Sequence, residues 1–145
     1  TELANGSKSE SIGAELAVNW QVSEQWRLLG AYSYMDYDLL PDDDVRDGSE
    51  WDVDHLFSLQ SRLDIFENTQ FDAWLRYTDE VEYYDIDDYW TLDLRLSWQL
   101  SDKLILSLHG KNVLDGAHAE YQSIQREFVQ TQIERSYRAE IRYVF

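Results

Sequence analysis

The amino-acid sequence predicts an all-β protein, an antiparallel up-and-down meander of about seven strands. Apolar and polar residues alternate with a period of two in seven segments of roughly ten residues, as expected when successive side chains point to opposite faces of a strand. The chain also has 10 Tyr, 6 Trp, 5 Phe and a single Pro, and aromatic side chains suit a pleated sheet. No helical period competes with this alternation over a comparable length.

The first four predicted strands form two pairs, each joined by a short polar gap. Residues 12–22 and 26–37 are separated by the sequence SEQ. Residues 55–65 and 71–78 are separated by FENTQ, and Trp74 is an apolar exception on the polar side of the second strand. Because a parallel return needs a long crossover, strands joined by such short gaps are antiparallel.

The last three predicted strands follow the same scheme. Residues 90–100, WTLDLRLSWQL, show the cleanest alternation in the chain and are joined by SD to residues 103–112. A long segment from about Val113 to Glu134 then leads to the terminal strand, residues 136–145. We expect this long segment to be a loop.

The gaps between the strands alternate in length: short, long, short, long, short, long. All short gaps therefore lie at one end of the sheet, and all long gaps, of which the first two are strongly acidic, lie at the other. Transmembrane β-barrels of bacterial outer membranes have this asymmetry, with tight periplasmic turns and long extracellular loops. A soluble sheet with one face on a core shows the same alternation within its strands, so the alternation alone leaves both classes open.

Aromatic residues gather near both ends of the predicted strands, as they do at the two interfaces of a membrane. Those near the short gaps are Trp20, Trp26, Phe66, Phe71, Trp98, Tyr143 and Phe145. Those toward the long gaps are Tyr32, Tyr34, Tyr77, Trp90 and Tyr137. Together with the sorting of the gaps, the two bands favour the membrane barrel.

Composition excludes several classes of partner and site. The formal net charge of −17, from 29 acidic and 12 basic residues, argues against binding to nucleic acid or to anionic lipid headgroups. The chain has no Cys, which excludes disulfides and thiolate metal sites. It has no run of about 18 apolar residues, so no transmembrane helix is predicted. The polar start, TELANGSKSE, is not expected to be a signal peptide.

No arrangement of residues predicts catalysis, so we expect neither enzyme activity nor a cofactor. His55, His109 and His118 are scattered, and His109 falls on the polar side of its strand, where a hydrogen bond is expected. The segment PDDDVRDGSEWD is similar to a calcium-binding loop, but Val45 stands where such a loop needs an oxygen ligand. No metal site is therefore predicted.

The two long acidic gaps are the candidate ligand-binding loops. Carboxylates and tyrosine rings in the second gap suit a cationic or metal-chelate ligand, or divalent ions that bridge lipopolysaccharide. The alternative to a ligand-binding role is a pair of solvated loops that bind nothing specific. The candidate residues are Asp42, Asp43, Asp44, Asp47, Tyr83, Tyr84, Asp85, Asp87 and Asp88. Charges on the polar side of the strands are expected to pair across strands. They include Arg62, Asp64, Asp72, Arg76, Asp93, Arg95, Arg138, Glu140 and Arg142.

Several stretches, taken in order, resemble the C-terminal part of a TonB-dependent outer-membrane receptor. NGSKSESIGAELAVNW resembles a loop and strand of that family with a Gly-x-Glu step at Gly13 and Glu15, and WTLDLRLSW resembles a late strand with an inward acidic residue, Asp93. GKNVLDGAHAEY resembles the turn after the penultimate strand, with departures in its middle from the Asn-Leu-Phe-Asp pattern of that turn. IERSYRAEIRYVF resembles the last strand, closed by a terminal aromatic residue.

The resemblance implies that residues 1–145 are the C-terminal portion of a transmembrane barrel of about 22 strands, without its plug domain and earlier strands. It implies that the intact protein takes up a scarce nutrient, such as a ferric siderophore, across the bacterial outer membrane. The implied partners are outer-membrane lipid, the rest of the barrel with its plug domain, the TonB system through regions outside this sequence, and the barrel assembly machinery. The implied assembly signal consists of Tyr137, Ile141, Tyr143 and Phe145.

Two other interpretations remain open at the level of the sequence. One is a soluble antiparallel β protein that binds a ligand or partner on an aromatic face. The other is a small, complete outer-membrane barrel with a structural role, which would need one more strand because an odd number of antiparallel strands cannot close without a parallel seam.

Overall fold

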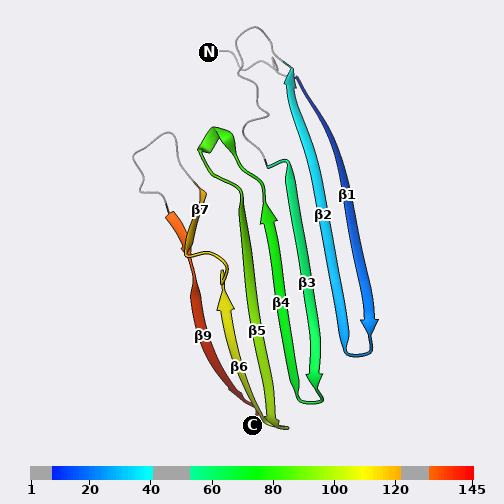
Figure 1. Ribbon diagram of the computed structural model, residues 1–145, viewed down its shortest axis with the longest axis vertical. Coiled ribbons are helices and arrows are strands. Elements are labelled where there is room, and N and C mark those ends of the chain that lie inside the picture. Colours follow the sequence, from blue (N-terminus) through cyan, green and yellow to red (C-terminus); the bar gives the residue numbers. More distant parts are fainter. Residues whose placement is uncertain (1–7, 41–52, 122–130) are drawn as a thin grey trace.

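The computed structural model describes residues 8–40, 53–121 and 131–145, and seven strands in them form one antiparallel sheet (Figure 1). These strands are β1 (Lys8–Ser23), β2 (Trp26–Leu40), β3 (His55–Phe66), β4 (Thr69–Thr78), β5 (Tyr89–Ser101), β6 (Leu104–Lys111) and β9 (Ser136–Tyr143). Their order in the sheet is β1-β2-β3-β4-β5-β6-β9, which is also their order along the chain. This confirms the predicted up-and-down meander.

The short connections β1–β2, β3–β4 and β5–β6 all lie at one end of the sheet, the lower end in Figure 1, together with the C-terminus. Near each of them the strand register shifts by one residue. The shifts fall between Gln21 and Ser23, between Asp64 and Phe66, and between Gln99 and Ser101. Such bulges increase the local twist and help a sheet to curve.

A small second sheet lies at the opposite end. The prediction of a loop from Val113 to Glu134 was therefore wrong in part. Strands β7 (Ala117–Tyr121) and β8 (Thr131–Glu134) pair there as an antiparallel hairpin. Their sequences, AHAEY and TQIE, carry few apolar residues, so the period-two pattern gives no strand signal. Contacts of His118 with Asn112 and Tyr89 hold the hairpin in place instead.

The only helix in the described ranges is the 3-10 helix η2 (Glu82–Tyr84), between β4 and β5. No helix in this part of the chain has both the length and the apolar character needed to cross a bilayer.

One face of the seven-stranded sheet is apolar. Residues directly opposite each other on paired strands lie on the same face, so the register defines lateral rows of side chains. One row contains Leu16, Tyr32, Phe57, Tyr77 and Trp90. Another contains Trp26, Leu63, Phe71, Leu96, Leu108 and Ala139. The leucines of residues 92–96, Trp98 and the leucines of residues 104–108 therefore share one face.

Burial is inverted relative to a water-soluble protein. Within the described residues Ile86 is the only buried apolar residue, whereas the buried polar ones are Thr91, Ser97, Ser107, Asn112 and His118. Large apolar side chains are exposed, with Ile12 at 70% and Ile141 at 72% of full exposure. An apolar face this wide, with no packed layer over it, requires a nonaqueous surrounding or a partner.

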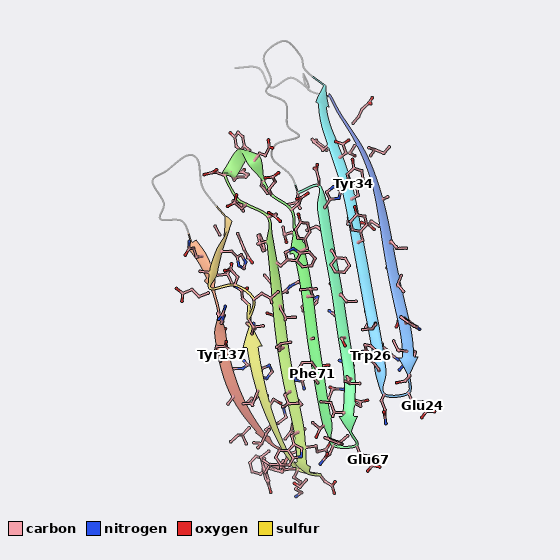
Figure 2. The ribbon with its side chains drawn as sticks, viewed as in Figure 1. Glu24, Trp26, Tyr34, Glu67, Phe71 and Tyr137 are labelled. Carbon is pink, nitrogen blue, oxygen red and sulfur yellow. The ribbon has the colours of Figure 1, made fainter. Side chains whose placement is uncertain are left out.

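Aromatic bands border this face at both ends, but the prediction for Tyr137 was wrong, because the register places it at mid-height in the row of Leu94 and Gly110. In Figure 2, Trp26 and Phe71 lie near the end of the sheet at which Glu24 and Glu67 mark two of the short turns, whereas Tyr34 lies toward the other end. On β5 the bands are represented by Trp98 and Trp90, eight residues apart. Eight residues span about 27 Å along a strand, or roughly 20 Å once the strand is tilted by about 40°, close to the apolar height of a membrane barrel.

Candidate functional site

The other face of the sheet, the polar face, carries small hydroxyl groups between long charged side chains. Ser97 on β5 and Ser107 on β6 are both buried, and their Oγ atoms lie 2.8 Å apart. Arg95 donates from Nε to the Oγ of Ser97 at 2.9 Å. Each buried hydroxyl thus has a hydrogen-bond partner, as a polar group away from water requires.

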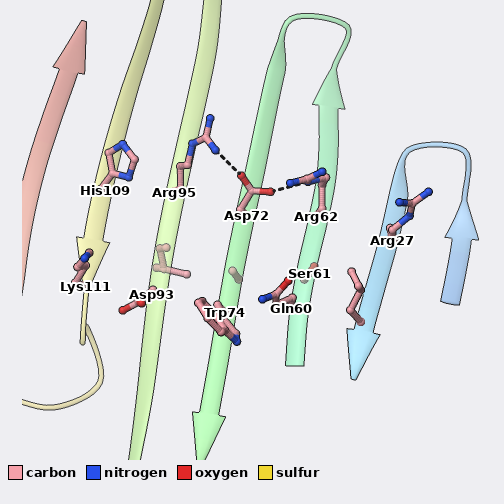
Figure 3. A pocket seen from close by; sticks show the side chains of 13 residues that line it. Arg27, Gln60, Ser61, Arg62, Asp72, Trp74, Asp93, Arg95, His109 and Lys111 are labelled. Carbon is pink, nitrogen blue, oxygen red and sulfur yellow. Dashed lines mark hydrogen bonds and ion pairs between the residues drawn. The ribbon is translucent and has the colours of Figure 1, made fainter. Parts of the chain in front are cut away.

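Cross-strand ion pairs lie on this face, as predicted for Arg62, Asp72, Arg76, Asp93 and Arg95 (Figure 3). Arg138 and Arg142 instead pair with Glu140 on their own strand. The carboxylate of Asp72 on β4 lies between two guanidinium groups, with Arg62 Nε at 3.3 Å and Arg95 Nη1 at 3.6 Å. Nη2 of Arg76 on β4 lies 2.8 Å from Oδ2 of Asp93 on β5. Arg62, Asp72, Asp93 and Arg95 border a hollow of about 470 Å³ that extends from β2 to β6.

Trp74, the apolar exception, is anchored on the polar face. Its Nε1–H donates to Ser58 Oγ on β3 at 2.8 Å, and the guanidinium carbon of Arg76 lies 4.2 Å from the centre of its ring. An indole ring satisfied at its only polar atom and covered by a cation is stable among charged neighbours. The ring remains 37% exposed and forms part of the wall of the hollow.

A chain of hydrogen bonds connects the polar face to the hairpin β7–β8. Asp93 Oδ1 accepts from the backbone N–H of Asn112 at 3.0 Å, and Nδ2 of Asn112 lies 3.2 Å from Nδ1 of His118. The His118 ring stacks on Tyr89, with ring centres 4.2 Å apart. Nε2 of His118 is 3.2 Å from Oε1 of Glu120. The sequence shows His118 only as one of three scattered histidines. Its position six residues after Asn112 is the one signal that could have indicated its role in holding the hairpin.

The structure describes only one of the two groups of predicted loop residues. Asp42, Asp43, Asp44 and Asp47 lie outside the described residues. The second group is gathered in one compact turn: Tyr83 and Tyr84 in η2, then Asp85, Asp87 and Asp88. The rings of Tyr83 and Tyr84 meet edge to face, 5.2 Å apart. Backbone hydrogen bonds between Val81 and Ile86 close the turn that contains Tyr83, Tyr84 and Asp85.

The predicted assembly residues lie on or just after the edge strand β9. Tyr137, Ile141 and Tyr143 share the apolar face with Gly110, Leu106 and Leu104 of β6. Phe145 follows the strand and is fully exposed, and its ring meets the Tyr143 ring edge to face at 5.2 Å. The backbone N–H of Val144 still donates to Lys103 at 2.9 Å, which fixes the chain end beside the β5–β6 turn.

The remaining histidines show no catalytic arrangement. Nδ1 of His55 is 2.8 Å from the hydroxyl of Tyr32, in the upper aromatic band. His109 faces the polar side as predicted, but its Nε2 has no hydrogen bond within the described segments and lies 3.9 Å from Glu140. Among these same segments no three His, Cys, Asp or Glu side chains are grouped so that they could hold a metal ion.

An antiparallel meander with an uncovered apolar face, aromatic bands at both ends, sorted loop lengths and an ion-paired polar face defines a class of protein, the outer-membrane β-barrel. The chain belongs to the outer membrane protein beta-barrel family, whose model matches residues 1–144. Its place is therefore the bacterial outer membrane, and the soluble alternative is wrong. A search of curated protein sequences found no match.

Solved structures with the same fold are receptor barrels. The chain superimposes on the FpvAI–pyocin S2 complex with a TM-score of 0.77 at 18% identity, covering 94% of this chain and 19% of the other. It matches the siderophore receptor PiuA from Acinetobacter baumannii with a TM-score of 0.75 at 18% identity, over 94% and 22% of the two chains. It matches the ferric-catecholate import receptor Fiu from E. coli K12 with a TM-score of 0.72 at 16% identity, over 93% and 21%. The chain thus spans about a fifth of the length of these proteins.

Proposed function

We propose that residues 1–145 form the C-terminal portion of the barrel of a TonB-dependent receptor, which in the intact protein imports a scarce nutrient such as a ferric siderophore. The observation that carries this proposal is the open meander itself, which shares its fold with about a fifth of each receptor chain. In the described part of the sheet, β1 and β9 are the two edges and do not pair with each other. This favours a segment of a larger barrel over a small complete one, because exposed strand edges are not tolerated in lipid.

In this proposal the apolar face contacts lipid and the polar face is the inner wall of the barrel, which holds a plug domain. The long acidic connections are extracellular and capture the ligand. The turn that carries Tyr83, Tyr84 and Asp85 is suited to a cationic group or a metal chelate, since it combines aromatic rings with carboxylates. Energy for import comes from TonB through regions outside this sequence.

The last strand is proposed to serve assembly. Tyr137, Ile141, Tyr143 and Phe145 present a continuous outward aromatic and aliphatic edge that ends beside the short turns. This edge is the surface that we propose the barrel assembly machinery reads before the barrel closes.

The test is uptake in a strain that lacks the gene for the intact protein. Restoring the gene is expected to restore growth on at least one ferric siderophore of a panel under iron limitation. The combined substitution Asp85→Asn, Asp87→Asn and Asp88→Asn should weaken that uptake, because it removes carboxylates from the proposed extracellular turn. The matched control, Glu24→Gln with Glu67→Gln, neutralises the short turns at the opposite end and should leave uptake unchanged. Equal uptake by the two variants would remove the ligand role of the turn.

A further inference from the structure

A buried imidazole lies where the hairpin β7–β8 meets the seven-stranded sheet, and the proposed function does not use it. His118 lies in β7 opposite Ile133 of β8 and is 9% exposed. Its ring stacks on Tyr89 of β5, and its Nδ1 lies 3.2 Å from Nδ2 of Asn112, the residue that follows β6. A change in the charge of this ring would therefore act at the junction between the hairpin and the sheet.

Nδ1 of His118 faces two groups of opposite hydrogen-bonding character. Nδ2 of Asn112, at 3.2 Å, can only donate, whereas the carboxylate of Asp115, with Oδ2 at 3.5 Å, can only accept. Without a proton Nδ1 accepts from Asn112, and with a proton it can only donate, to Asp115. The ring nitrogen therefore cannot bond to both groups at once.

The side-chain amide of Asn112 is held in one orientation. Its Nδ2 also donates to the backbone oxygen of Ile133 at 3.3 Å. A reversed amide would give Oδ1, which is buried without a partner among the described residues, a bond from a protonated Nδ1, but it would leave two oxygens facing each other at Ile133. Donation to Nδ1 requires the neutral ring to carry its proton on Nε2, which lies 3.2 Å from Oε1 of Glu120.

The groups around the ring determine the direction of a pH effect. Asp115 and Glu120 lie three and two residues from His118 along the chain, so they stay near the ring whether or not the hairpin is docked on the sheet. Burial and the Asn112 donor oppose a charged ring only when the hairpin is docked. The face of the Tyr89 ring attracts a charged imidazole and offsets part of this effect.

The adjoining elements carry further ionisable side chains. Within the described segments none of them forms an ion pair with His118, whose two charged partners are Asp115 and Glu120. These further side chains are Asp93, Lys111, Glu134 and Arg135.

We propose that the hairpin β7–β8 is a pH-sensitive element, in which a proton on Nδ1 of His118 breaks the bond to Asn112 and releases the hairpin from the sheet. Histidine side chains ordinarily change charge between about pH 5 and pH 8, so release is expected across this range. A proton that binds more readily to the released hairpin must, by linkage, favour release. The inference does not depend on the proposed function, because it concerns only contacts within the described residues.

The test measures amide hydrogen exchange of the intact protein in detergent at about pH 7.5 and about pH 5, with labelling times scaled for the intrinsic effect of pH on exchange. Protection of β7 and β8 is expected to fall by about fivefold in acid, the effect of one lost neutral hydrogen bond, while β1 and β2 stay within about twofold. His118→Asn places an amide oxygen near the position of Nδ1 without a titrating group, so its hairpin should respond to pH by less than about twofold. His55→Asn is the matched control, because Nδ1 of His55 on β3 is 2.8 Å from the Tyr32 hydroxyl, and it should respond like the parent.

Asn112→Asp provides a second, independent readout. It replaces the donor that faces Nδ1 by an acceptor, so the pH response of the hairpin should reverse, with more protection in acid. Protection of the parent hairpin that is unchanged or higher in acid would overturn the proposal, as would a loss in His118→Asn equal to that of the parent. If the hairpin of His118→Asn is unprotected at both values of pH, Asn112→Asp decides, and its failure to reverse the response would overturn the proposal.

Discussion

The carboxylate of Asp93 on β5 accepts the backbone N–H of Asn112, nineteen residues later, at 3.0 Å. Asn112 ends the sheet beyond β6 with a left-handed backbone, φ 49°, and is only 3% exposed. The second oxygen of Asp93 is held by Arg76 at 2.8 Å. One carboxylate therefore fixes both the upper end of the sheet and the residue from which the hairpin β7–β8 departs.

Replacement of Asp93 should loosen that hairpin without unfolding the sheet. In Asp93→Ala the buried N–H of Asn112 loses its acceptor, which costs about 1–3 kcal/mol. Amide hydrogen exchange of the intact protein should speed up in β7 and β8 and stay unchanged in β1 and β2. Asp64→Ala, which removes a carboxylate bonded to the side chain of Gln70, is the control and should leave the hairpin protected. Unchanged exchange in the Asp93 variant would show that the hairpin is held by other contacts.

A charge on the apolar face should be far more costly than the same charge on the polar face. Leu94 lies midway between Trp90 and Trp98 and faces Ala73 and Gly110. Leu94→Arg is expected to lower the free energy of unfolding in lipid vesicles by about 2–4 kcal/mol, measured by urea titration. Asn19→Arg, on the polar face of β1, should change it by less than about 1 kcal/mol. Similar losses for both would contradict the assignment of the lipid face.

Two glycines on the apolar face should respond differently to alanine. A Cβ at Gly110 would lie 2.8 Å from Val113 Cγ1 and 3.4 Å from the Tyr137 ring, whereas at Gly30 its nearest neighbour would be Leu59 Cδ1 at 3.9 Å. Gly110→Ala should therefore destabilise the end of β6 by about 1–2 kcal/mol, because the Val113 side chain must move away from the new methyl group. Gly30→Ala should be neutral or slightly stabilising, since it lowers the entropy of the unfolded chain. The temperature of the gel-mobility transition measures both, and a larger loss for Gly30→Ala would refute the close packing of Val113 against Gly110.

Phe145→Ala should impair assembly more than stability. Phe145 is fully exposed and, among the described residues, its ring meets one other aromatic ring, that of Tyr143, so an assembled barrel should lose little when the ring is removed. Outer-membrane levels of the intact variant are expected to fall several-fold, while the melting temperature of the inserted protein stays close to that of the parent. Val144→Ala, at the neighbouring position, is the control for both measurements. Equal insertion of the Phe145 variant and the parent would show that the ring is not part of an assembly signal.

The seven strands and their two faces could be predicted because each face has one environment. Where neither face packs into a mixed core, the period of two persists along the strand, as at Leu92, Leu94 and Leu96. Trp74 breaks the pattern, and the sequence does not reveal that Ser58 lies opposite its ring nitrogen. That contact depends on the pairing of β3 with β4.

The lateral rows and the hairpin β7–β8 lay beyond sequence reasoning. The rows depend on one-residue shifts near Ser23, Phe66 and Ser101, which leave the hydrophobic pattern unchanged while altering which residues are opposite each other. The hairpin depends on Asn112 and His118 meeting across a turn. Its strands are too short and carry too few apolar residues for the sequence pattern to predict them.

The absence of any fully buried large side chain in the described residues has a consequence for how this chain tolerates change. In an interlocked core, neighbouring substitutions depend strongly on each other, since one side chain must fit the space that another leaves. Here Ile12 and Ile141 project from opposite edges of the sheet and share no neighbour. Exchanges among apolar residues at such positions should be independent and nearly additive. The apolar surface can therefore change its residues while its pattern stays constant. The polar face is less free, because charges such as Asp72 and Asp93 depend on specific arginine partners.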